Sequence, residues 1–219
     1  MGAKMKIFCF CILITIFSFK LAIAGESFQF AKDAIEGLFQ AKLAKTTMSN
    51  TSETDNLKAM TDGRIAVGKL KEAQSLIAAY ASSSDGKIAA TAKDYVAAYA
   101  GLIQGIDSNL LIMEKSMNNE YEGKEGTIAR QASENLASID KSWKTLVYAT
   151  TLLAHALVAV ESHLNISKKE KEELMKMLET DFGEDVKVEI VKGDRHATDV
   201  APAQLWYFLN QPWKTSEQQ

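Results

Sequence analysis

The chain has 219 residues, of which 47% are hydrophobic and 24% are charged, and it contains only two prolines. This composition is typical of a globular protein and excludes a disordered or low-complexity chain. With 28 acidic residues against 25 basic ones, the balance is mildly acidic, which argues against nucleic acid as a partner.

The N-terminal segment, residues 1–24, has the pattern of a secretory signal peptide. A basic start is followed by an apolar run (7–19) and by the small residues Ala22 and Ala24. The run is shorter than the roughly 20 residues that a membrane-spanning helix needs. We therefore expect cleavage after Ala24 and no stable membrane insertion of the mature chain; the alternative is an uncleaved anchor.

Both cysteines lie inside this segment, so the mature chain would have no disulfide and no thiol chemistry. An exported domain without disulfides fits the bacterial periplasm, or secretion from a bacterium, better than an animal extracellular fluid. Removal of the segment's three lysines leaves 22 basic residues against 28 acidic ones, a net charge of −6. Such a charge also argues against anionic lipid as a partner.

Helical spacing of apolar residues predicts three helices over roughly 26–47, 53–81 and 86–117. Ser52 or Thr54 is expected to cap the second helix. The apolar positions of the third helix step by three and four residues, close to the heptad seam of a coiled coil.

Glycines interrupt two of these helices. Gly63 and Gly68 weaken the second helix and predict a kink or a close helix contact there. Gly101 and Gly105 lie on one face of the third helix. Two interpretations stay open for this pair: a close approach of two helices, or glycines tolerated on an exposed face.

A fourth, central helix is predicted over residues 126–164. One apolar stripe runs along it, comprising Ile128, Leu136, Ile139, Trp143, Leu146, Leu153, Leu157, Val160 and Leu164. The connections between the four helices are short, so consecutive helices should be antiparallel neighbours. We predict an all-α fold, an up-down-up-down four-helix bundle over residues 25–165. The first helix is shorter than the fourth, which leaves part of the fourth uncovered.

Residues 166–219 are predicted to form a shorter C-terminal helical tail that packs on the bundle and fills this gap. A capping box from Ser167 to Glu170 opens one helix, and Gly183 ends it. The alternating residues 186–190 predict a strand or a short helix. A last helix, with Pro202 in its first turn, is the most aromatic part of the chain.

We expect Thr198 or Asp199 to cap that last helix, because both are common N-cap residues.

The sequence carries no motif for catalysis or for a cofactor. It lacks the Glu-x-x-His pairs of di-iron bundles, the Cys-x-x-Cys-His of c-type haem, the Gly-x-His-x-x-Glu of imelysin-like proteins, a nucleophile elbow and a phosphate loop. We therefore predict a protein that is not an enzyme and holds no cofactor or metal. A minor alternative is a metal carrier, or a b-type haem carrier that pairs His155 with Met60 or Met113.

Seven residues are candidates for ligand or partner binding because they combine aromatic, imidazole or guanidinium groups near the tail: Tyr148, His155, Arg195, His196, Trp206, Tyr207 and Trp213. The other interpretation of Arg195 is an ion pair that pins the tail, and the aromatic residues could simply be core.

Two functions follow from this architecture. Long exported four-helix bundles resemble the ligand-binding domains of bacterial sensors, so the first is a binding, sensing or adaptor module of the cell envelope, with a small apolar ligand or an envelope protein as partner. The second is a structural or interaction protein of the envelope, including a homo-oligomer. Aromatic tail residues around a void would favour a ligand, whereas an exposed aromatic patch would favour assembly.

Overall fold

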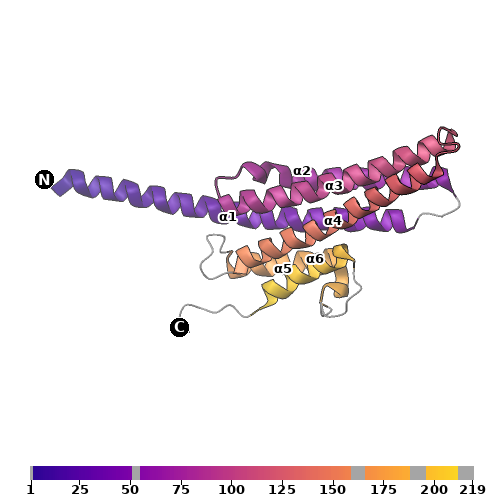
Figure 1. The fold of residues 1–219 in the computed structure, drawn as a ribbon. Coiled ribbons are helices and arrows are strands. Elements are labelled where there is room, and N and C mark those ends of the chain that lie inside the picture. Colours follow the sequence, from indigo (N-terminus) through magenta and orange to yellow (C-terminus); the bar gives the residue numbers. More distant parts are fainter. Residues whose placement is uncertain (1, 51–54, 159–165, 188–195, 212–219) are drawn as a thin grey trace.

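The computed structural model describes residues 2–50, 55–158, 166–187 and 196–211, and for residues 2–24 it describes the backbone alone. All regular structure in these ranges is helical, which confirms the predicted all-α bundle (Figure 1). The elements are α1 (Gly2–Ser49), α2 (Asn56–Ala78), η1 (Ala79–Ser82), α3 (Gly86–Met117), α4 (Glu125–Val158), α5 (Lys168–Phe182), η2 (Gly183–Lys187) and α6 (Ala197–Asn210).

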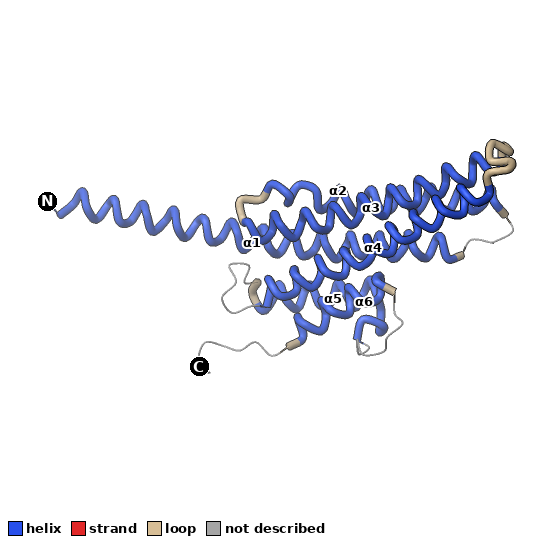
Figure 2. The backbone as a smooth tube through the Cα atoms, in the orientation of Figure 1, coloured by secondary structure: helices blue, strands red, loops and turns tan. Residues whose placement is uncertain are grey.

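Consecutive helices alternate in direction through the whole chain, including the tail (Figures 1 and 2). α5 runs alongside α1 in the same direction. Lys32 forms an ion pair with Glu173 at 2.9 Å, and further along both helices the rings of Phe39 and Phe182 lie 6.1 Å apart.

α6 runs alongside α4, also in the same direction. At its start the rings of His196 and Trp143 are 4.8 Å apart, and near its end the rings of Phe208 and His155 are 4.6 Å apart. Since α1 and α4 make little direct contact, the tail helices fill the space between them. α6 therefore covers α4 from about residue 143 onward; the tail packs on the bundle as predicted, but it does not fill the gap beyond the end of α1, because residues 125–141 of α4 stay uncovered.

Helix boundaries follow the sequence closely, with two differences. α1 continues back to Gly2, since no proline separates it from residues 2–24. α2 gives way to the 3-10 turn η1 at Ala79. α4 is described as far as Val158, and the predicted residues 159–164 lie outside the described ranges. Val186 belongs to the short helix η2, one of the two predicted alternatives, while residues 188–190 lie outside the described ranges.

Two predicted caps are wrong. Asp55 caps α2 by accepting a hydrogen bond from the Lys58 amide, so the cap is neither Ser52 nor Thr54. His196 caps α6, not Thr198 or Asp199, so Pro202 falls in the second turn of the helix. The capping box of Ser167 and Glu170 is present as predicted, because both of its partners lie within one turn of the chain.

α3 is the core helix. It is long and apolar enough to cross a membrane by length and composition, the one such helix among the residues searched. Here it is flanked by α2 and α4, and its side chains Tyr95, Tyr99 and Leu102 are fully buried. α1 packs mainly on α2 and lies diagonally opposite α3, which it reaches through side chains: the rings of Phe30 and Tyr95 are 6.3 Å apart, and the Tyr99 hydroxyl sits over Gly37.

The glycines on α3 mark a close approach of two helices. A Cβ atom at Gly105 would overlap with Ile139 of α4, and one at Gly101 would overlap with the hydroxyl of Ser142. This confirms the first of the two interpretations for the pair. In α2, Gly63 likewise lies against Leu110, whereas a Cβ at Gly68 would meet no atom within 4 Å.

Candidate functional site

One end of the bundle, where α3 turns into α4, is covered by neither α1 nor α6. We call it the open end, and define it as residues 56–65 of α2, 107–117 of α3 and 125–141 of α4. Within the α3 and α4 parts of the open end no residue is buried, whereas buried residues recur at helical spacing in the other half of both helices.

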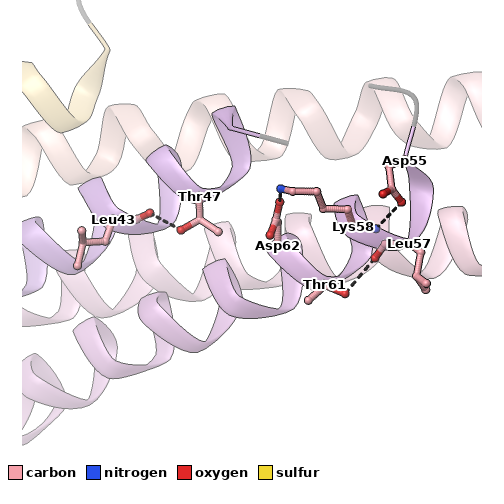
Figure 3. Close-up of polar contacts among 7 residues, drawn as sticks. All are labelled: Leu43, Thr47, Asp55, Leu57, Lys58, Thr61 and Asp62. Atoms are coloured by element: carbon pink, nitrogen blue, oxygen red, sulfur yellow. Dashed lines mark hydrogen bonds and ion pairs between the residues drawn. The ribbon is translucent and has the colours of Figure 1, made fainter. Parts of the chain in front are cut away.

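The open end results from where the covering helices stop. α1 ends at Ser49, its last turn closed by the Thr47 hydroxyl, which donates to the Leu43 carbonyl at 2.9 Å (Figure 3). α6 begins beside Trp143. Because α2, α3 and α4 all continue beyond these points, they form a three-helix end from which the covering helices are missing.

Two of the apolar residues exposed there belong to core-facing stripes. Met117 ends the seam of α3 and is 46% exposed. Leu136 lies on the stripe of α4 and is 61% exposed. These two side chains have the register of a core and no covering partner among the described residues. Leu57 of α2 is 69% exposed, but it lies on the same helix face as the exposed Arg64 and Lys71, away from the buried face of α2.

α3 is the middle helix of this end. α2 and α4 each pack on α3 and hardly touch one another; we use the name trough for the face of α3 between them that lies beyond the end of α1. Both flanking helices contact α3 directly here. Gly63 of α2 packs on Leu110, and Asn135 of α4 donates a 2.9 Å hydrogen bond to Asn109.

The start of α2 is ordered by local polar contacts (Figure 3). Asp55 accepts from the Lys58 amide at 2.9 Å, and the Lys58 ammonium pairs with Asp62. The Thr61 hydroxyl donates to the Leu57 carbonyl at 3.0 Å. The backbone that carries Leu57 is therefore held in a regular helix while its side chain remains exposed.

The predicted tail residues do not converge on one point. The Trp206 indole, half-buried, donates to Glu179 of α5 at 3.2 Å, whereas the next residue, Tyr207, is 51% exposed. Adjacent residues on a helix point about 100° apart, which explains the separation. Tyr148 on α4 is 59% exposed. Arg195 and Trp213, also predicted, lie outside the described residues.

The two histidines of this region occupy different environments. His155 is exposed, with its ring against Phe208, so it does not face Met60 or Met113 across the core as the haem arrangement requires. His196 is half-buried at the junction of three helices. In the part of the chain that the structure describes, no three His, Cys, Asp or Glu side chains are grouped to hold a metal ion.

Burial changes the acidity of several groups in the bundle. Burial raises the pKa of Tyr95, and its hydrogen bond to Thr150 acts in the opposite direction. Burial, followed by the nearby Glu36, raises the pKa of Asp181. These groups lie within helix contacts and not at the open end.

Sequence reasoning placed Leu136 on the apolar stripe of the fourth helix and therefore in the core. The signal that could have identified its exposure is helix length, because the predicted first helix is too short to cover the whole of the predicted fourth helix. Comparison of the chain with protein-family models, with curated proteins and with solved structures gives no match.

Proposed function

We propose that this protein is an exported, non-catalytic adaptor of the bacterial cell envelope, which binds an amphipathic helix of a partner protein in the trough of its open end. The observation that carries the proposal is the exposure of core-register residues from two helices at one end of the bundle, namely Met117 of α3 and Leu136 of α4.

A helix is the occupant that fits the trough. Along the covered half of α3, the same seam is filled by α1, whose Phe30 and Gly37 lie against Tyr95 and Tyr99. The trough at the open end continues that seam beyond the end of α1. Amphipathic helices bind such grooves through apolar residues at helical spacing, so a partner helix would extend a packing arrangement already present in the chain.

Export is supported by the signal pattern of residues 1–24 and by where burial begins. Ser27 and Phe30 are fully buried in the bundle, and Gly25 is exposed. Cleavage after Ala24 would leave these contacts in place. The mass of the denatured protein recovered from its producing cell tests this step, since retention of residues 1–24 contradicts it.

Self-assembly is the second candidate, because the exposed Tyr148 and Tyr207 add aromatic surface on α4 and α6. Exposed patches of this kind are used in contacts between chains. A small apolar ligand has less support, since Trp206 is engaged with Glu179 and Tyr207 points to solvent.

The test uses a fluorescent, leucine-zipper-like amphipathic peptide as the probe and measures its anisotropy with the mature chain. We expect binding that the double variant M117S/L136S weakens at least tenfold, because each of the two side chains contributes roughly 1.5–3 kcal/mol when it is buried. The matched variant Y148S/Y207S, which removes exposed side chains elsewhere, should bind like the wild type.

Sedimentation of the same samples separates the two candidates. A dimer that M117S/L136S dissociates would make a second copy the occupant and favour the structural function. A monomer that binds no peptide, with both variants indistinguishable from wild type, contradicts the adaptor proposal.

A further inference from the structure

The first turn of α6 is closed by an imidazole in place of the usual hydroxyl or carboxylate. The Thr198 amide donates to Nδ1 of His196 at 3.2 Å, and the Thr198 hydroxyl oxygen lies 3.0 Å from the same nitrogen. An imidazole nitrogen accepts only when it carries no proton. The cap therefore requires neutral His196 with its proton on Nε2.

This cap lies at the junction of α6 with two other helices. The His196 ring meets the Trp143 ring of α4 edge-on, with centroids 4.8 Å apart. Lys45 of α1 forms a 3.6 Å ion pair with Asp199, three residues after the cap. The start of α6 is thus fixed to α4 through the imidazole and to α1 through the ion pair.

The surroundings of the His196 ring disfavour its protonation. Burial is the first cause that lowers the pKa of His196 below its usual 6.5, and Lys45 is the second; Asp199 acts in the opposite direction. From α4 the ring meets the uncharged indole of Trp143. In η2, Lys187 is paired with Glu179 and Glu184. A proton on the ring would also meet the positive end of the α6 dipole.

We propose that His196 is an acid-sensitive latch that holds α6 on the bundle when neutral and releases it when protonated. Protonation removes the acceptor for the Thr198 amide and places a cation beside Lys45. The two effects act together on the same turn of the helix.

The pH range follows from the direction of the shift. Because the folded chain binds this proton less readily than the unfolded chain, the stabilisation is complete above about pH 6.5 and is lost as the pH falls below that value.

Release of α6 would uncover apolar surface that is sealed at neutral pH. Leu205 and Leu209 of α6 are fully buried, as are Leu153 and Leu157 of α4. The latch therefore makes exposure of a second apolar surface depend on acidity. It stands on contacts at the tail, so it holds or fails independently of the partner proposed for the open end.

Hydrogen exchange of the full chain tests the latch. After correction for the intrinsic pH dependence of exchange, protection of residues 197–210 should fall about tenfold or more between pH 7.5 and pH 5.0. In H196N the fall should disappear, because asparagine is a good N-cap and does not titrate. H155Q, which removes an exposed histidine beside α6, should behave like the wild type.

Imidazole ¹⁵N chemical shifts of the wild type give a readout that does not depend on any variant. We expect His196 to be the Nε2–H tautomer at pH 8 and to titrate together with the loss of α6 protection. Protection that persists at pH 5.0, an equal loss in H196N, or titration of His196 at a pH unrelated to the loss would each overturn the proposal.

Discussion

The two halves of α4 share one apolar stripe and differ in what covers them. From residue 142 to 157, Trp143, Leu146, Leu153 and Leu157 are buried. From 125 to 141 no residue is buried, and Leu136 is 61% exposed. The stripe has the same spacing in both halves, although residues 146–158 are apolar nearly all round and residues 125–141 are mostly polar outside the stripe. Amphipathic spacing therefore indicates which face of a helix is apolar, but not whether another element reaches it.

The largest expected effect comes from one substitution made in each half. L146A should lower the free energy of unfolding by about 2–5 kcal/mol, since it leaves a cavity in a closed core. L136A, the same change on the same stripe, should cost about 0.5 kcal/mol or less. Urea denaturation of the two variants gives the difference. Equal losses would mean that the open end is covered in solution.

The contact between α3 and α4 can be tested through its glycines. G105A should destabilise the chain by about 1–3 kcal/mol, because the new Cβ would overlap with Ile139. The control G68A adds the same atom where nothing lies within 4 Å, and should stabilise α2 by up to about 1 kcal/mol. The thermal unfolding temperatures of the two variants should shift in opposite directions relative to the wild type. A neutral G105A would show that the two helices can separate freely.

Two buried tyrosines sharpen the description of the covered half. The Tyr95 hydroxyl donates to Thr150 at 2.9 Å, while the buried Tyr99 hydroxyl has no hydrogen-bond partner among the described residues. Y95F should cost about 1 kcal/mol, and Y99F should leave stability unchanged or raise it by up to about 1 kcal/mol. Chemical denaturation distinguishes them. A clear loss in Y99F would reveal a partner for that hydroxyl.

The smallest effect is expected where the tail meets α1 at the surface. The ion pair of Lys32 with Glu173 is partly exposed on both sides, so a double-mutant cycle with K32M and E173Q should give a coupling of about 0.5 kcal/mol or less. The coupling should shrink further in salt. A value above about 2 kcal/mol would mean that this pair, and not the apolar contacts of the tail, holds α5 in place.

Local features of the fold were predictable, and features that depend on several elements were not. The capping box at Ser167 and the start of α3 after Asp85 depend on residues within one turn, and both were found from the sequence. The caps of α2 and α6 were missed because several suitable residues stand in a row at each site. Backbone geometry selects among them, and it assigns one cap to His196, a residue type that is rarely considered.

The candidate site shows the same division. The aromatic tail residues were predicted from composition, but their directions depend on the rotation of α6, which sends Trp206 to α5 and Tyr207 to solvent. The exposure of Leu136 depends on where α1 ends and on the register between α6 and α4. No local pattern around Leu136 contains that information.

The alternation of helix directions has a consequence for how the molecule could be attached. The start of the bundled part of α1 and the end of α6 lie at the same end of the molecule, where Lys171 at the beginning of α5 contacts the Gln211 carbonyl (Figure 1). The open end lies at the far end of α4, whose 34 residues span about 50 Å. A tether at either of those positions would hold the trough at a fixed distance from the attachment point.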